Sequence, residues 1–291
     1  MQKVKKAVIP VAGYGTRFLP FTKAVPKAML PVVNKPAIQL IIEEASNSGI
    51  EEILLVVGQH KEIIEQHFLP YRDLEEHLEK TNATELLNQV KAIENIAKIK
   101  YIVQEKQLGT AHAVLSAREF VGDEPFAVMF GDDLMYSDKK PVLKQLIDAF
   151  YQDGKTVIGV KNVGYENVSK YASVEYDGVS GSLYHVTAIT EKPERDKAKS
   201  DLAPLGRYVL RGGFLDVLSK VKPGYGGEYQ LTDGLGLEIN EAGLNAYAFE
   251  GKRYDMGDVF GFLQANCEYA LRDEKLSEKM RAYFLDTAKK L

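Results

Sequence analysis

The sequence predicts an α/β fold in which helices cover both faces of a doubly wound mixed sheet. In the first half of the 291-residue chain, short strand-like runs alternate with helical patterns, an order typical of such folds. Several runs are apolar throughout, for example EILLVV at 52–57 and FAVMF at 126–130. Uninterrupted apolar strands indicate a parallel sheet that is buried on both faces.

Strands and helices follow one another through the first half. A strand is predicted over 6–12 and a helix over 37–48, where Ile38, Ile41 and Ile42 share one face. Gly49 follows the helix and suits a left-handed cap. The other elements expected here are strands over 52–57, 100–103 and 126–130, helices over 61–68, 110–120 and 140–151, and a polar helical segment over 74–97.

The second half is richer in strands, which are added to the sheet of the first half. We expect one domain over 1–257, in halves of about 1–150 and 151–257, without a clear linker between them. The expected elements are strands over 156–160, 171–176, 184–190, 206–210 and 246–250, and a helix over 228–240.

The tail from Asp258 onward is predicted to form a separate helical segment over 258–291. Such an amphipathic stripe most often packs in a core, and a contact with another subunit is the alternative. The stripe consists of Leu276, Met280, Tyr283, Phe284 and Leu291 at helical spacing.

Composition and charge exclude several classes of protein. The net charge of −4 argues against a dedicated nucleic-acid binder. The single cysteine, Cys267, excludes an internal disulfide. No run approaches the roughly 20 apolar residues that span a bilayer. The apolar run at 7–12 is too short for a signal peptide, so we interpret it as a strand. We expect a cytoplasmic protein without nucleic-acid or membrane partners.

The most informative stretch is VIPVAGYGTRFLP at 8–20, where the first strand ends in two glycines and an arginine. Bare backbone at Gly13 and Gly15 allows amide groups to approach an anion closely. Arg17 offers a planar fork for phosphate oxygens, and Lys27 follows as a point charge. Together these residues predict a cradle for a polyphosphate.

Two common phosphate-binding motifs do not fit this stretch. A P-loop requires Gly-x-x-x-x-Gly-Lys-Ser/Thr, which the stretch lacks. A dinucleotide fingerprint requires a third glycine where the chain has Phe18. Ligands of doubly wound folds bind beyond the carboxyl ends of strands, so the glycine turn and Gly131-Asp132-Asp133 should lie near the same rim.

The stretch VAGYGTRFLP, followed by Pro26-Lys27, resembles the signature of sugar-1-phosphate nucleotidylyltransferases, and more narrowly that of the bacterial UTP–glucose-1-phosphate uridylyltransferases. The resemblance implies a nucleotidyltransferase fold, Rossmann-like and similar to that of glycosyltransferases of type A. It continues in family order over nearly the whole chain, through MLP at 29–31, GDD at 131–133, EKP at 191–193, GRY at 206–208, EYQLTD at 228–233 and GKRYD at 251–255.

The implied reaction joins UTP to glucose 1-phosphate, with Mg²⁺ as cofactor, and gives UDP-glucose and pyrophosphate. The nucleophile is already an anion, so the barrier is electrostatic: two unit charges at 4 Å repel by about 4 kcal/mol at an effective dielectric of 20. Cations and positioning should therefore carry catalysis. We expect Arg17 to contact the β- and γ-phosphates, and by resemblance Lys27 the triphosphate and Lys192 the sugar phosphate.

The resemblance also distributes the binding roles, with the nucleotide in the first half of the domain and the sugar phosphate in the second. A glutamine amide such as that of Gln104 can read the donor and acceptor edge of uracil, and His112 is expected to pack in its helix. The implied nucleotide-binding residues are Ala12, Gly13, Gly15, Thr16, Gln104, Gly109, Asp132 and Asp133. The sugar-binding residues are Ala172, Glu191, Lys192 and Glu228, and the metal ligands are Asp132 and Asp255.

The chain departs from the family pattern at two positions. Ala28 stands where the family has an acidic residue after the lysine, and Ala172 where it has a glycine near the sugar. The alternatives that remain open are the same chemistry on dTTP, galactose 1-phosphate or N-acetylglucosamine 1-phosphate, or a weakly active regulatory paralogue. The resemblance further implies a homodimer or homotetramer.

Overall fold

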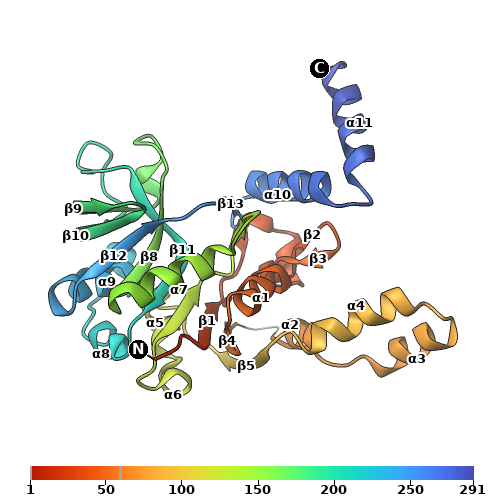
Figure 1. Cartoon of the computed structure of the whole chain (residues 1–291), viewed down its shortest axis with the longest axis horizontal. Helices are drawn as coiled ribbons and strands as arrows, with labels where there is room; N and C mark the ends of the chain where they lie inside the picture. The colour runs from red at the N-terminus through yellow and green to blue at the C-terminus, as the bar shows by residue number, and fades with distance from the viewer. Residues whose placement is uncertain (1, 59–60) are drawn as a thin grey trace.

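The computed structural model describes residues 2–58 and 61–291, and a mixed sheet of nine strands runs through these residues (Figure 1). On one side of the sheet, β1 is parallel to both β4 and β6, and β4 to β5. The strands are, in spatial order, β5 (Lys98–Val103), β4 (Glu52–Val57), β1 (Lys6–Pro10), β6 (Phe126–Met129), β11 (Leu202–Leu210), β8 (Thr156–Asn162), β12 (Leu244–Ala248), β10 (Leu183–Glu191) and β9 (Ala172–Ser180).

Helices cover both faces of this sheet, which confirms the predicted doubly wound α/β class. Alternate residues of β1 enter different cores: Ala7 and Ile9 pack on one face, and Val8 on the other. The first core includes residues of α1 (Ala37–Asn47) and α7 (Val142–Asp153). The second includes residues of α5 (Thr110–Leu115), α8 (Phe214–Leu218) and α9 (Leu231–Glu241).

The second half of the chain joins the same sheet through antiparallel pairing. Strand β11 is antiparallel to both β6 and β8, and β10 is antiparallel to β12 and β9. The two halves expected from the sequence therefore share one sheet. The remaining short elements are β2 (Pro31–Val32), β3 (Lys35–Pro36), η1 (Thr16–Phe18), η2 (Phe21–Lys23), η3 (Lys27–Met29), η4 (Val168–Lys170), η5 (Tyr225–Gly227), α2 (Lys61–Phe68) and α6 (Arg118–Val121).

The segment expected to be helical over 74–97 is helical but interrupted. The segment forms two helices, α3 (Arg72–Lys80) and α4 (Thr84–Glu94), which project together from the body (Figure 1). The break lies at Asn82, which has a φ of 56°. Asparagine is one of the few residues besides glycine that adopt this left-handed region readily, so the chain reverses there.

A two-stranded ribbon that the sequence did not predict joins distant parts of the chain. Strand β7 (Asp133–Tyr136) pairs antiparallel with β13 (Lys252–Asp255), and this register sets Asp255 opposite Asp133. The ribbon continues one step further, because Met256 N donates a hydrogen bond of 2.7 Å to Asp132 O. Carboxylates separated by more than 120 residues are thereby brought to one place.

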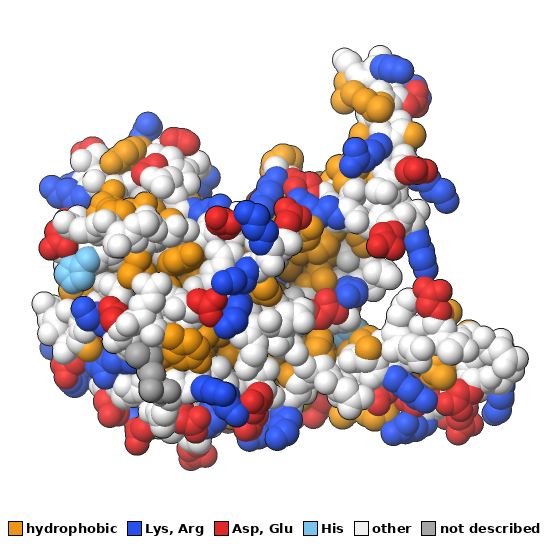
Figure 2. Space-filling view, in the orientation of Figure 1, with side chains coloured by type: hydrophobic (Ala, Val, Ile, Leu, Met, Phe, Trp, Pro, Cys, Tyr) orange, Lys and Arg blue, Asp and Glu red, His pale blue; other side chains and the backbone are white. Residues whose placement is uncertain are grey.

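The tail forms α10 (Val259–Arg272) and α11 (Ser277–Ala288), and α11 projects from the body (Figure 1). The prediction that the apolar stripe of the tail packs in a core is wrong, because no residue of α11 is buried and Tyr283 is 62% exposed. Figure 2 shows hydrophobic atoms among charged ones along this projection. A contact between subunits through α11 stays a prediction. None of the described helices is both long and apolar enough to cross a bilayer.

Candidate active site

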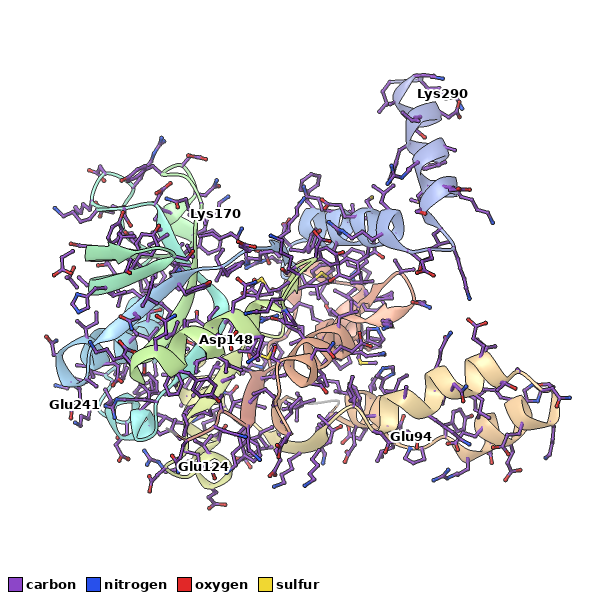
Figure 3. All side chains as sticks on the ribbon, in the orientation of Figure 1. Glu94, Glu124, Asp148, Lys170, Glu241 and Lys290 are labelled. Atoms are coloured by element: carbon purple, nitrogen blue, oxygen red, sulfur yellow. The ribbon has the colours of Figure 1, made fainter. Side chains whose placement is uncertain are left out.

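A cavity of about 380 Å³ opens at the rim of the sheet, where β1 and β6 end. Residues from both halves of the domain line it, among them Lys170, which is labelled in Figure 3. Doubly wound folds bind their ligands beyond the carboxyl ends of strands, so the cavity lies where a ligand is expected. Of the site residues predicted from the sequence, the cavity brings together Arg17, Asp132, Asp133, Ala172, Glu191, Lys192 and Asp255.

The glycine turn after β1 packs directly against Lys27, whereas Arg17 is held by a hydrogen bond to Gly257. Gly15 has a φ of 64°, and a Cβ there would lie 3.0 Å from Cβ of Lys27, so the bare turn packs directly against the lysine. Thr22 Oγ1 donates a hydrogen bond of 2.8 Å to Gly15 O. Arg17 Nη1 donates one of 2.9 Å to Gly257 O. Gly13 and Thr16 are exposed on the same turn.

Lys27 is paired with Asp132, the first carboxylate after β6. Nζ of Lys27 lies 2.8 Å from Oδ2 of Asp132, whose side chain is 41% exposed. Burial tends to raise the pKa of Asp132, but the charge and hydrogen bond of Lys27 outweigh it, so the pKa lies below its usual value. Asp132 is therefore a carboxylate at neutral pH, as a metal ligand must be.

A smaller cavity of about 80 Å³ adjoins this pair and is lined by Gly13, Lys27, Ala28 and Asp132, among others. Ala28 is only 4% exposed and lines this smaller cavity with its methyl group. The methyl group offers no hydrogen-bond acceptor.

Arg253 organises the other two carboxylates, and the sequence reasoning missed it. Its Nε donates to Asp133 Oδ1, its Nη1 donates to the Tyr171 hydroxyl at 3.0 Å, and its Nη2 lies 3.4 Å from Asp255 Oδ2. Burial raises the pKa of Asp133 to about 6, against the opposing charge of Arg253. Burial opposes the charge on Arg253, yet the Asp133 carboxylate raises the pKa of the guanidinium. A lone arginine in GKRYD carries no sequence signal for this role.

Asp133 borders the cavity, but its carboxylate is almost fully occupied by contacts with protein. Its side chain is 7% exposed, and a Cβ added to Gly206 would lie 2.1 Å from its Oδ2. Gly206 has a φ of 57°, so this position requires glycine on both counts. The structure therefore fits Asp133 to an orienting role better than to direct contact with a nucleotide.

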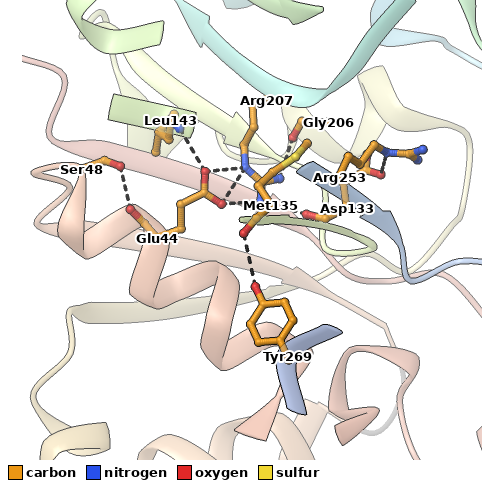
Figure 4. Close-up of polar contacts among 9 residues, drawn as sticks. All are labelled: Glu44, Ser48, Asp133, Met135, Leu143, Gly206, Arg207, Arg253 and Tyr269. Carbon is orange, nitrogen blue, oxygen red and sulfur yellow. Dashed lines mark hydrogen bonds and ion pairs between the residues drawn. The ribbon is translucent and has the colours of Figure 1, made fainter. Parts of the chain in front are cut away.

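A buried ion pair between Arg207 and Glu44 contacts the backbone at Asp133, the first residue of β7 (Figure 4). Arg207, with a side-chain exposure of 0%, shares its one Nε–H between the two carboxylate oxygens of Glu44 on α1 and donates from Nη2 to Oε2. The same Nη2 donates to Asp133 O at 2.8 Å, and Glu44 Oε1 accepts from Leu143 N at 3.0 Å. The Arg207–Glu44 pair thus joins α1, α7 and β11 to the backbone at Asp133.

The two predicted metal ligands, Asp132 and Asp255, border one space beside Gly257. A Cβ added to Gly257 would lie 2.9 Å from Asp255 Oδ1, 3.2 Å from Asp132 Oδ2 and 3.5 Å from Arg17 Nη1. The glycine keeps this space open. The described residues contain no group of three or more His, Cys, Asp or Glu side chains placed to hold a metal ion. Two carboxylates with phosphate oxygens and water are a usual environment for Mg²⁺, so the donor set fits this ion.

Two of the sugar-side residues lie on β9 and β10, whose pairing sets Glu191 opposite Ala172. Glu191 Oε2 accepts a hydrogen bond of 2.7 Å from Thr232 Oγ1 at the start of α9. Lys192 follows with a φ of 41°, and its N donates to Tyr171 O at 2.9 Å. A non-glycine residue in this region is uncommon and marks a position that its surroundings over-determine.

Eight predicted residues do not line the main cavity. Four of them, described above, are Lys27, Gly13, Gly15 and Thr16, and the other four are Ala12, Gln104, Gly109 and Glu228. Ala12 accepts a hydrogen bond of 2.6 Å from Gln107 Nε2, a contact the sequence reasoning missed. Gln104 is bonded through Nε2 to Nδ1 of His112 at 2.9 Å, so its amide is occupied from one side. Gly109 packs under Tyr229, whose O would lie 2.4 Å from an added Cβ. Glu228 is exposed and accepts from Gln230 Nε2, at the edge of the cavity.

The family model described as nucleotidyl transferase matches residues 6–272 of the chain. The chain belongs to the nucleotidyl transferase family. Its match spans the whole sheet, the cavity and α10, so the family resemblance expected from the motifs is confirmed.

Named members of the nucleotidyl transferase family are similar to the chain over almost its full length. A UTP–glucose-1-phosphate uridylyltransferase of Staphylococcus saprophyticus is 47% identical over 96% of this chain and 96% of its own. One of Bacillus subtilis is 46% identical over 99% of this chain and 97% of its own. A solved structure of a UTP-bound UDP-glucose pyrophosphorylase from Acinetobacter baumannii is 34% identical, with a TM-score of 0.89 over 97% of this chain and 99% of its own.

Proposed function

We propose that the chain is a UTP–glucose-1-phosphate uridylyltransferase, which transfers the uridylyl group of UTP to glucose 1-phosphate and releases pyrophosphate. The observation that carries the proposal is that one cavity is lined by Arg17 from the glycine turn, Lys192 from the sugar side and the carboxylates Asp132 and Asp255. Relatives that share 45–47% of their residues with the chain bear this enzyme name.

The proposed reaction is one in-line displacement without a covalent intermediate. The sugar-phosphate oxygen attacks the α-phosphorus of UTP, the bond from that phosphorus to the β-phosphate oxygen breaks, and pyrophosphate leaves. No base is needed, because the attacking oxygen carries no proton at neutral pH. The chain's task is to hold two anions end to end, and positioned cations in a partly enclosed site do this without reorganising during the reaction.

The cations divide this task between the two halves of the domain. Residues 1–150 hold the nucleotide: Arg17 contacts the β- and γ-phosphates, and Lys27 lies nearer the α-phosphate. Residues 151–257 hold the sugar phosphate, with Lys192 on the phosphate and Glu191 on sugar hydroxyls. The base lies against Ala12 and Gly13, with Gln104 and Gly109 behind them, and Gly15 and Thr16 offer backbone amides to the phosphates.

Asp132 and Asp255 would hold Mg²⁺ in the space beside Gly257. The bound ion supplies positive charge that offsets the charge of phosphate oxygens. Arg253 fixes Asp255 from one side through its 3.4 Å contact, and Lys27 fixes Asp132 from the other at 2.8 Å. Each carboxylate is thereby oriented by a cation.

Asp132→Asn is expected to raise the Mg²⁺ concentration for half-maximal activity about tenfold, since removing a ligand or its support typically costs 10–100-fold in metal affinity. The side chain keeps its size, so the fold should be unaffected. A magnesium titration of initial rates measures the change. Asp138→Asn, which alters an exposed carboxylate bonded to Tyr136, is the matched control. Equal titrations for Asp132→Asn and wild type would remove Asp132 from the metal role.

A grid of UTP, dTTP, ATP and GTP against glucose 1-phosphate, galactose 1-phosphate and N-acetylglucosamine 1-phosphate tests the assignment of substrates. Pyrophosphate release gives kcat/KM for each pair. We expect UTP with glucose 1-phosphate to be best. A different best pair would overturn the substrates and leave the chemistry intact, whereas binding without turnover in every pair would make the chain a regulatory paralogue.

A further inference from the structure

An exposed aromatic ring lies beside the lysine of the sugar side. Nζ of Lys192 lies over the ring of Tyr225, 5.0 Å from its centroid. We propose that Tyr225 is a positioning residue, whose ring holds the Lys192 ammonium at the sugar-phosphate end of the cavity without neutralising its charge. This role rests on the function proposed above. Tyr225 is 55% exposed, so core packing does not account for a tyrosine at this position.

The backbone that carries Tyr225 is fixed although its side chain is exposed. Gly224 N donates a hydrogen bond of 2.8 Å to Glu228 O, which closes the turn around η5. A Cβ added to Gly224 would lie 2.3 Å from Asp233 Oδ2 in the first turn of α9. Gln230, which lines the cavity, donates from Nε2 to Tyr225 O at 3.4 Å. The turn is therefore tied to the same helix start that borders the sugar side.

The backbone of Lys192 is fixed independently, at the end of β10. Its φ of 41° lies in a region that side-chain-bearing residues seldom adopt, and its N is bonded to Tyr171 O. Beyond Cα, however, a lysine has a flexible four-carbon stem that loses conformational freedom when its ammonium is localised. The Tyr225 ring restricts that stem before any ligand arrives.

The choice of an aromatic partner has an electrostatic consequence. Lys27 is paired with a carboxylate, which cancels part of its charge. An aromatic ring attracts a cation through its quadrupole and carries no net charge of its own. Lys192 therefore keeps its full positive field for an incoming phosphate monoester. Tyr225 should affect the sugar phosphate, which Lys192 faces, and leave the nucleotide unaffected.

A double-mutant cycle tests the role, with Tyr225→Leu made both in the wild-type chain and in Lys192→Met. Initial rates with the substrate pair that the wild type uses best give kcat and both KM values. An exposed cation–π contact predicts that Tyr225→Leu raises KM for the sugar phosphate about two- to fivefold, with KM for the nucleotide unchanged. In Lys192→Met, the same change should add nothing. Tyr225→Phe retains the ring and should restore the wild-type value.

Tyr71→Leu is the matched control, because Tyr71 is 62% exposed and lies beside α3, on the projecting arm. An equal rise in KM in both backgrounds, a parallel rise for the nucleotide, or a Tyr225→Phe variant as impaired as Tyr225→Leu would overturn the role of Tyr225. If another substrate pair proves best, the substrate assignment fails and the same KM values still decide this role. If the chain shows no turnover with any substrate pair, both the proposed enzyme function and the role of Tyr225 would be overturned.

Discussion

Arg17→Ala and Lys192→Ala are each expected to lower kcat/KM by at least about 100-fold. One charge-assisted contact in a preorganised site contributes about 3 kcal/mol to the transition state, and this energy corresponds to a factor of about 100 in rate. In the proposed mechanism each residue contacts one of the two anions that must meet, so both variants should have a lower kcat as well as a lower kcat/KM. Steady-state kinetics with UTP and glucose 1-phosphate measure the effect.

Two surface cations provide the controls for these variants. Arg118 forms an exposed pair with Asp216 at 2.6 Å, and Lys139 lies 3.7 Å from Glu250 in an exposed loop. Arg118→Ala and Lys139→Ala remove the same charges elsewhere and should keep kcat/KM within about twofold of wild type, because exposed pairs contribute about 0–1 kcal/mol. Near-normal kinetics of both Arg17→Ala and Lys192→Ala would mean that the site lies elsewhere.

Glu44→Leu and Arg207→Met are each expected to lower the free energy of unfolding by about 3–5 kcal/mol. Each change leaves an uncompensated charge in the interior, and that loss far exceeds the net contribution of the intact pair. Arg207 has 0% side-chain exposure and Glu44 7%, so water cannot replace the missing partner. Urea unfolding, followed by linear extrapolation, gives the free energies.

The double variant Glu44→Leu/Arg207→Met removes both charges and should lose much less than the sum of the single losses. Arg118→Met, which breaks an exposed pair, is the control and should cost at most about 1 kcal/mol. Single variants within about 1 kcal/mol of wild type would contradict a structural role for the pair. A folded Arg207→Met chain should also show reduced kcat/KM, since its Nη2 bonds to the Asp133 backbone.

The parts of the fold that local patterns specify were predicted well from the sequence. The uninterrupted apolar runs at β4 and β6 are central strands, and the ranges 52–57 and 61–68 coincide with β4 and α2. The break at Asn82 and the exposed stripe of α11 were not predicted. The first depends on a single left-handed residue, and the second on whether any surface covers the stripe, and periodicity reports neither.

The residues of the cavity likewise divide into those that the sequence indicates and those that it does not. Arg17, Asp132 and Lys192 stand out because their motifs combine cations or carboxylates with glycine or proline. Arg253 and Gly257 carry no such signal, because their roles arise when β13 pairs with β7 across more than 100 residues of chain. Pairing of strands so far apart in the chain depends on the whole fold, so the residues that it brings together cannot be derived from one segment.

A crystal structure of the chain with UDP-glucose bound tests the central claim most directly: two anionic substrates are held end to end across the cavity by cations from its two halves. The account predicts the diphosphate between the Gly13–Arg17 turn and Lys192, with the glucose beside Glu191 and the uracil against Ala12 and Gly13. A diphosphate bound away from that turn, or contacting neither Arg17 nor Lys192, would contradict it.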